Sequence, residues 1–275
     1  MSLPVDLINV ALTRRKSVLF VTLDRPEAKN ALTAEMVEGL VRLADELPRE
    51  DIRTVVLRGA GGSFCAGGDV KGFAKQMMAP DPEQGEPDPV REGNRIFGTL
   101  LQKLDAIPQV LVSVVEGAAF GGAMGFLSVS DVVLSAADSK FSLSETTLGL
   151  PPAQIGPFVV RKIGLFNARR LALTGARFGA TEASQVGLVD TIADSAHRPL
   201  DAVLGDTLEA IGRCEPNAIS ATKRLLNKAA ADINDEQLDA AADDFVACLR
   251  GNGRAGAMAF AAKQTPPWVE TYDEE

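Results

Sequence analysis

Two glycine-rich segments carry the clearest potential for chemistry in this 275-residue chain. They cover residues 59–69 and 116–125, and each follows a predicted strand. Gly121-Gly122 stands where an apolar strand gives way to a predicted helix, and free N–H groups at a helix N-terminus attract an anion. An N–H of Ala66-Gly67 converging on the same point would complete an oxyanion hole, in which each donor stabilises the transition state by about 3–4 kcal/mol. A thioester enolate suits such a pair because its charge develops on one oxygen.

Other uses of glycine-rich loops fit less well. A dinucleotide fingerprint requires a third glycine where Phe64 stands, and a phosphate-binding loop requires a Gly-Lys-Ser/Thr sequence that the chain lacks. A tight turn or close packing would explain either segment alone. The two segments together therefore favour an anion site over a nucleotide site.

Side chains able to act as nucleophiles or metal ligands are scarce. The one histidine, His197, lies in a polar, proline-bearing stretch that is predicted to be a loop, which disfavours Ser-His-Asp and Cys-His catalysis. Cys65 adjoins the first glycine-rich segment, but without a base or a positive partner it is predicted to be a packing thiol. No zinc-binding motif is present, so no metal is expected. Catalysis is expected to use carboxylates, backbone dipoles or a cofactor.

Composition restricts the partners of the chain. The net charge of −9 argues against non-specific nucleic-acid binding. The richest apolar stretch, residues 110–137, is interrupted by Glu116 and Asp131 and is too short of apolar residues to span a membrane. The N-terminus has no secretory pattern, and three widely spaced cysteines fit a reducing compartment. We therefore expect a cytoplasmic protein that binds neither nucleic acid nor membrane.

The elements that position these groups alternate between strands and helices up to about residue 192, which predicts an α/β fold. The predicted strands cover residues 17–24, 52–57, 110–115, 132–135 and 140–143, and the predicted helices cover residues 34–47 and 91–104. Residues 77–89 are predicted to be a surface loop. Four alanine-rich helices follow, at residues 201–213, 217–231, 235–250 and 254–263. We expect an α/β core over residues 1–195 and a helical region over 196–275, whose apolar stripes serve packing and self-association or, alternatively, partner binding.

Four stretches, taken in order, resemble the crotonase superfamily of enoyl-CoA hydratases and isomerases. They are residues 23–33 (LDRPEAKNALT), 63–69 (SFCAGGD), 117–122 (GAAFGG) and 141–145 (FSLSE), and the resemblance extends from about residue 17 to 265. It implies a spiral of ββα repeats followed by a helical trimerisation region, assembled into homotrimers or hexamers. It also implies an acyl-CoA thioester substrate, with no metal or redox cofactor beyond the coenzyme A of the substrate.

The resemblance also implies roles for individual residues. The N–H groups of Ala66 and Gly122 match the positions that hold the thioester oxygen, and Glu145 matches one of two catalytic glutamates. The residues that match the coenzyme A surface are Arg25, Ala28, Lys29, Ala66, Gly67, Gly68, Asp69, Phe260 and Lys263. Both Glu145 and Lys263 have an alternative, structural interpretation. Glu145 would be an acidic residue that the helix dipole favours at the start of a helix, and Lys263 would be a solvated lysine at the end of a helix.

The position of the second glutamate is occupied by Gly125. Asp69 and Glu116 are nearby in sequence, but the family pattern makes neither an obvious substitute. This departure leaves open three activities: hydration with one protein glutamate, double-bond isomerisation, and acyl-CoA binding without catalysis. The number of carboxylates at the site is therefore the feature on which the choice between these three activities depends.

Residues 116–125, 148–161 and 213–223 resemble a narrower branch, the bacterial methylglutaconyl-CoA and isohexenylglutaconyl-CoA hydratases, the latter of acyclic terpene degradation. Glutaconyl substrates carry a distal carboxylate. Our hypothesis is that this carboxylate, or a polar group of the pocket, orients water, so that one protein glutamate suffices. Glycine at position 125 is expected to free space for a branched acyl chain.

Overall fold

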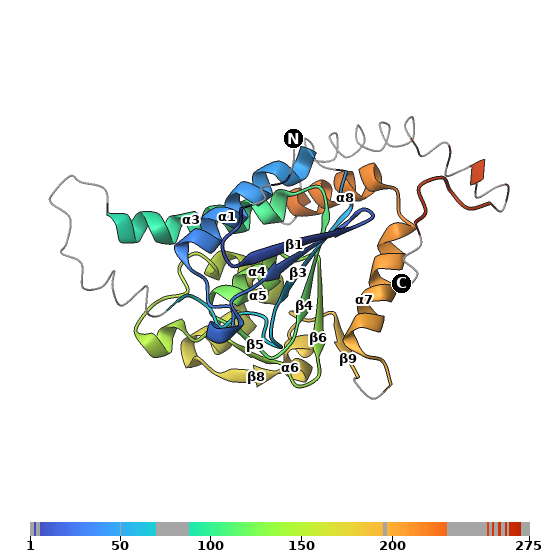
Figure 1. Ribbon diagram of the computed structural model, residues 1–275. Coiled ribbons are helices and arrows are strands. Elements are labelled where there is room, and N and C mark those ends of the chain that lie inside the picture. Colours follow the sequence, from blue (N-terminus) through green and yellow to red (C-terminus); the bar gives the residue numbers. More distant parts are fainter. Residues whose placement is uncertain are drawn as a thin grey trace.

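A six-stranded sheet forms the centre of the fold (Figure 1). The computed structural model describes residues 3, 6–49, 51–69, 88–194, 197–229, 252, 255, 258, 259, 262 and 264–270. The strands, in spatial order, are β1 (Val10–Arg15), β2 (Val18–Leu23), β3 (Thr54–Gly59), β4 (Val110–Val115), β6 (Val132–Ala136) and β9 (Thr191–Ala193). Only the β1–β2 pair is antiparallel. The carboxyl ends of β3 and β4 therefore lie at the same edge, where both glycine-rich segments begin.

Helices cover both faces of this sheet, which explains its continuous apolar strands. One face packs against α1 (Ala34–Glu46), α3 (Pro89–Ala106), α4 (Gly122–Val129) and α5 (Gly156–Thr174), and the other packs against α7 (Leu200–Gly212). Strand alternation divides the side chains: Leu19 and Val21 join the first core, whereas Val18 and Phe20 join the second. Strand β4 lies between these two layers, and every one of its residues is buried.

A second, three-stranded sheet holds the elements next to the glycine-rich segments. It consists of β5 (Ala118–Phe120), β7 (Lys140–Ser142) and β8 (Arg177–Gly179), and α6 (Ala180–Gln185) follows β8. Short 3₁₀ turns, η1 (Pro26–Ala28), η2 (Leu47–Arg49) and η3 (Glu145–Leu148), complete the elements together with α8 (Pro216–Ala229). Because β5 leads into α4 and β7 leads into η3, this small sheet fixes both the second glycine-rich segment and Glu145.

The predicted α/β class is confirmed, with local differences. The helix predicted at 34–47 is α1, while the strand predicted at 52–57 is β3, shifted by two residues. Strands β1 and β5 were not expected from the sequence, because their short polar-flanked stretches carry little periodic signal. The helices predicted at 201–213 and 217–231 are α7 and α8, whereas the helix predicted at 235–250 lies outside the described residues. The division at residue 195 stays a prediction.

The C-terminal segment 264–270 is tied to the start of β3 by the buried side chain of Arg53. Its guanidinium donates to the carbonyl oxygens of Trp268 at 2.7 Å, of Gly212 at 3.3 Å and of Cys214. It also lies 3.3 Å from a carboxylate oxygen of Glu270. A buried cation requires such partners, so Arg53 joins the end of α7 and the chain terminus to the central sheet. Among the described residues, no helix has the length and apolar character needed to cross a membrane.

Candidate active site

The two glycine-rich segments lie side by side as short parallel strands. The Cys65 N–H donates to the Ala118 carbonyl at 2.9 Å, and the Phe120 N–H donates to the Cys65 carbonyl at 3.0 Å. Cys65 is thereby paired with Ala119. Farther along the two segments, the Cβ position of Gly67 lies 3.7 Å from Cα of Gly121, so the loop after β3 and the N-terminus of α4 converge.

Gly68 and Gly122 each present an N–H group with no acceptor among the residues that the structure describes. Gly122 is the first residue of α4, where backbone N–H groups have no partner within the helix. Both residues are partly accessible, while Gly67 and Gly121 beside them are buried. Two amides free to donate, at converging and accessible positions, form an anion site of the oxyanion-hole type.

The prediction that Ala66 supplies the first of these amides is wrong. The Ala66 N–H already donates to the Lys29 carbonyl at 2.9 Å, and the Gly67 N–H is directed at the Cys65 sulfur at 3.4 Å. Gly68, which the sequence placed only among the coenzyme A contacts, has the free amide instead. Gly122, by contrast, lies where the motif predicted a donor.

Glycine is required at positions 67 and 121 because the two segments approach so closely. Both residues have positive φ, +97° for Gly67 and +54° for Gly121. A Cβ on Gly67 would lie 3.0 Å from the Phe120 carbonyl oxygen, and a Cβ on Gly121 would lie 3.3 Å from Oε1 of Glu145. The same contact places the Glu145 carboxylate directly beside the N-terminus of α4.

Glu145 begins η3 and is held there by its neighbours. The Thr146 hydroxyl donates to the Ala172 carbonyl at 2.7 Å, and the Ser142 hydroxyl donates to the Gly175 carbonyl at 3.2 Å, so the turn is docked on the end of α5. Oε2 of Glu145 is buried with no hydrogen-bond partner among the described residues. Burial raises the pKa of this carboxyl, although its own backbone N–H opposes the shift. Glu145 can therefore hold a proton at higher pH than an ordinary glutamate and deliver it to a group at the glycine site.

Apolar side chains surround the Cβ position of Gly122, whereas the Cβ position of Gly121 faces Glu145. A Cβ there would lie 3.3 Å from Cδ1 of Leu32 and 3.4 Å from the Phe97 ring. The Phe97 ring in turn packs edge-on against Phe126, with ring centroids 5.6 Å apart. Both walls limit the access of water, which strengthens electrostatic interactions at the two amides.

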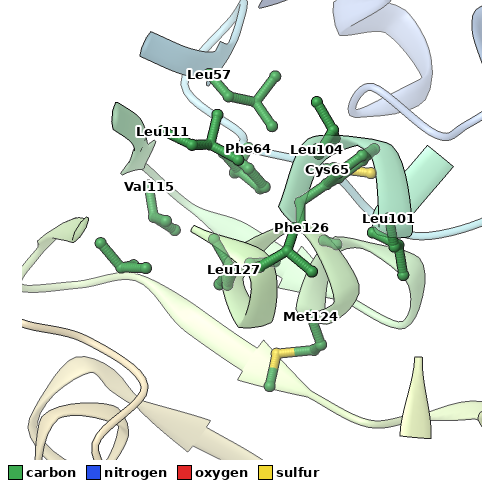
Figure 2. Packing of buried hydrophobic residues seen from close by; sticks show 14 of the residues in the cluster. Leu57, Phe64, Cys65, Leu101, Leu104, Leu111, Val115, Met124, Phe126 and Leu127 are labelled. Carbon is green, nitrogen blue, oxygen red and sulfur yellow. The ribbon is translucent and has the colours of Figure 1, made fainter. Parts of the chain in front are cut away.

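The expectation that Gly125 frees space for the acyl chain is wrong. A Cβ at position 125 would lie 2.7 Å from Cγ2 of Ile155 and 2.9 Å from Cδ1 of Leu101. Figure 2 shows Leu101 beside the helix that carries Phe126. The volume that a longer side chain would occupy is thus filled by two hydrocarbon side chains, and neither can accept a proton.

The segments predicted to contact coenzyme A lie against each other. Arg25 pairs with Asp69 at 3.1 Å and donates to the Ala31 carbonyl at 3.1 Å. Ala28 lies in η1 and is partly buried, and the side chain of Lys29 is exposed. Residues 25–30 and 65–69 therefore form one surface next to the free amides. The predicted contacts Phe260 and Lys263 lie outside the described residues.

The remaining reactive side chains are placed away from this chemistry. Cys65 is 0% exposed, burial raises its pKa to about 12, and Figure 2 shows its sulfur among the hydrocarbon side chains of the core. His197 is exposed and pairs with Asp194 at 2.8 Å. Glu116 is exposed. None of these groups substitutes for a carboxylate at position 125.

Sequence reasoning missed two residues that shape the site, Phe97 and Asn30. Phe97 lies on α3, and a single aromatic residue on a helix gives no sign of facing a distant glycine. Asn30 lies within the quoted 23–33 stretch, yet its side chain, described below, acts through tertiary hydrogen bonds that no spacing reveals. The sequence placed Phe97 on the helix predicted at residues 91–104, and it gave no further indication that this side chain lies at the site.

Comparisons with known proteins identify the family and the fold of the chain. The enoyl-CoA hydratase/isomerase family profile matches residues 13–271. The chain is 30% identical over 261 residues to the 1,2-epoxyphenylacetyl-CoA isomerase of Escherichia coli K12, covering 92% of this chain and 95% of that protein. Its fold matches an enoyl-CoA hydratase/isomerase from Marinobacter aquaeolei (TM-score 0.90, 41% identity, 95% and 99% of the two chains covered). It also matches Pseudomonas aeruginosa AtuE (TM-score 0.89, 44% identity, 96% and 100% covered). The chain belongs to the enoyl-CoA hydratase/isomerase family and has the crotonase-like fold.

Proposed function

We propose that this enzyme adds water to an α,β-unsaturated acyl-CoA whose acyl group carries a distal carboxylate, a branched glutaconyl thioester. The observation that carries the proposal is the placement of the Glu145 carboxyl, whose Oε2 has no hydrogen-bond partner among the described residues, beside Gly121 at the N-terminus of α4, where the Gly122 N–H has no acceptor among those residues. The family supplies the acyl-CoA substrate class. No cofactor is proposed beyond the coenzyme A of the substrate. We also propose that the protein is cytoplasmic, because its three cysteines are odd in number and widely spaced, which fits a reducing compartment.

In the proposed reaction the thioester oxygen accepts hydrogen bonds from the Gly68 and Gly122 N–H groups. Water bonds through its oxygen to the β-carbon, and the π electrons of the double bond move through the α-carbon onto the thioester oxygen. The enolate so formed is stabilised by the two amides. The α-carbon then takes a proton from Glu145, whose raised pKa suits it to act as an acid.

The proton released by the attacking water needs an acceptor, because Ile155 and Leu101 fill the space at Gly125. The distal carboxylate of a glutaconyl substrate provides one and holds the water near the β-carbon. The proton then passes to solvent, from which Glu145 is reprotonated. The net change is one water added across the double bond, with no oxidation or reduction.

The experiment compares 3-methylglutaconyl-CoA with crotonyl-CoA, using the purified protein in ¹⁸O-labelled water. We expect label in the glutaconyl product and a kcat/KM for crotonyl-CoA lower by about tenfold or more. Glu145→Gln, which keeps the size of the side chain, is expected to lose activity. Equal or better hydration of crotonyl-CoA would contradict the role of the distal carboxylate.

Double-bond isomerisation is the second candidate, favoured by the single carboxylate at the site. One carboxylate can remove a proton from one carbon and return it to another without any water. A β,γ-unsaturated acyl-CoA offered in labelled water distinguishes the two reactions, because an isomerised product contains no ¹⁸O. Tight acyl-CoA binding with no change in any thioester would instead indicate a protein that binds without catalysis.

We also propose self-association into a trimer or hexamer. Three large apolar side chains on α5 face solvent in the single chain: Leu165 is 60% exposed, Phe166 80% and Leu173 69%. Such a cluster marks a contact surface. Analytical ultracentrifugation of Phe166→Glu is expected to show a smaller species. Ile8→Glu is the control, because Ile8 is 58% exposed and lies before β1, outside both α5 and the C-terminal helical region.

A further inference from the structure

Asn30 is a fully buried polar side chain at the base of the loop that presents the Gly68 amide. It is 0% exposed and adopts a left-handed backbone conformation, with φ of 57°. The catalytic scheme above assigns it no part. A buried amide in an unusual backbone conformation persists when the surrounding contacts fix it, so its partners indicate what it holds in place.

All the partners of the Asn30 side chain are backbone groups of two segments. Its Oδ1 accepts the Arg25 N–H at 2.9 Å, which closes the turn around η1. Its Nδ2 donates to the carbonyl oxygens of Ala60 at 2.9 Å and Ser63 at 2.7 Å. The side chain thereby joins residues 25–30 to the first glycine-rich segment.

The backbone bonds that follow continue this join up to Gly68. The Ala66 N–H donates to the Lys29 carbonyl at 2.9 Å, next to Asn30. The Leu32 N–H donates to the Gly67 carbonyl at 2.8 Å, and the Asp69 N–H donates to the Leu32 carbonyl at 2.9 Å. These bonds use the Gly67 carbonyl and the Asp69 N–H, on either side of Gly68, and leave the Gly68 N–H without an acceptor among the described residues.

Close packing around the amide leaves no room for a shift. A Cβ at Gly59 would lie 2.6 Å from Nδ2 of Asn30 and 2.0 Å from the Ser63 carbonyl oxygen. Loss of the amide would therefore release two carbonyl oxygens and the loop that contains them. An oxyanion donor that moves by about 1 Å can cost on the order of 100-fold in rate.

We propose that Asn30 is a positioning residue, which sets the Gly68 N–H against the developing oxyanion by joining the 25–30 turn to the 60–69 loop. The inference rests on the proposed function, since it assumes that the Gly68 amide binds the thioester oxygen. It concerns how the donor is held, not which acyl group is hydrated.

The test is Asn30→Gly, because glycine keeps the left-handed conformation and removes only the side chain. The matched control is Asn9→Gly: Asn9 also has a positive φ, of 55°, but is exposed. We expect kcat of Asn30→Gly to fall about 10- to 100-fold with little change in KM, and Asn9→Gly to match the wild type. Asn30→Asp, which puts an oxygen against the Ala60 and Ser63 carbonyls, is expected to behave as Asn30→Gly.

A binding readout separates positioning from general loss of structure. Acetoacetyl-CoA forms an enolate whose near-ultraviolet absorbance reports its ionisation in the site. Asn30→Gly is expected to lose the enolate signal to a greater extent than it loses affinity for free coenzyme A, whose predicted contacts Arg25, Ala28 and Lys29 lie on the turn that Asn30 closes. This readout works even if the wild type hydrates none of the thioesters offered, in which case the proposed function fails and the inference is still tested. An unchanged kcat and enolate signal, or failure of both Asn30 variants to fold, would overturn the proposal.

Discussion

Cγ2 of Ile155 lies 2.7 Å from the place that a Cβ on Gly125 would occupy. The residue before α5 thus fills the site of the side chain that the resemblance assigns to a second catalytic glutamate. Leu101 closes the same volume from α3, with its Cδ1 at 2.9 Å. In the proposed reaction Glu145 is therefore the protein carboxylate that transfers the proton, because the carboxylate of Asp69, next to Gly68, is paired with Arg25.

This packing predicts that Gly125→Ala is destabilising. The added methyl group has to displace Ile155 or Leu101 within a filled core, which costs about 1–3 kcal/mol in the free energy of unfolding. Gly205→Ala is the matched control, because Gly205 lies inside α7 with open space around it, and there alanine is expected to stabilise by about 0.5–1 kcal/mol. Urea denaturation of both variants measures the difference. Equal free energies would mean that position 125 is not filled.

The Gly122 amide is tested by removing its N–H without ending the helix. Proline is tolerated at the first position of a helix, which Gly122 occupies in α4. Gly122→Pro is expected to lower kcat about 100- to 1000-fold relative to Gly122→Ala, which adds a Cβ but keeps the donor. Steady-state kinetics of the two variants on the same acyl-CoA gives this ratio. If alanine and proline cost the same, the loss comes from crowding against Leu32 and Phe97, not from the missing donor.

The pH dependence of the rate should report the protonation of Glu145. Hydration needs the protonated acid, so kcat should fall as the pH rises through the raised pKa of this carboxyl. Dehydration of the product needs the carboxylate, so its kcat should instead fall as the pH decreases through the same pKa. Glu116→Gln, at an exposed glutamate, is expected to leave both profiles unchanged. Two parallel profiles would argue that Glu145 does not transfer the proton.

The same raised pKa predicts a gain in stability on neutralising Glu145. Burial penalises the charged form in the folded state, so the wild type loses stability as pH rises from the unfolded pKa through the folded pKa. Glu145→Gln removes this charge. The Tm difference between variant and wild type should therefore be larger at about pH 8 than at about pH 3, where the carboxyl is almost entirely protonated in both the folded and the unfolded state. Calorimetry across this range checks the sign.

The sequence predicted the fold class. The catalytic roles of Glu145 and Gly122 stay predictions, although the structure places the Glu145 carboxylate beside the N-terminus of α4, as expected from two motifs that each follow a short strand. The sequence misplaced one donor amide, Ala66 for Gly68, since which amide of a glycine-rich loop stays free depends on the Lys29 carbonyl in a distant turn. It also treated Gly125 as empty space. Volume in a core is decided by tertiary neighbours such as Ile155, which local spacing does not identify.

The hydrogen bonds of Arg53 to residues far along the chain affect the stability of the protein during its synthesis. Its guanidinium is buried at the start of β3, yet two of its three carbonyl partners, Gly212 and Trp268, belong to the end of α7 and to the segment 264–270. During synthesis the sheet can form well before those last residues leave the ribosome. Products that end before residue 264 lack the Trp268 carbonyl and the Glu270 carboxylate that pair with this cation, so we expect them to be less stable than the 275-residue chain and more readily degraded by quality-control proteases.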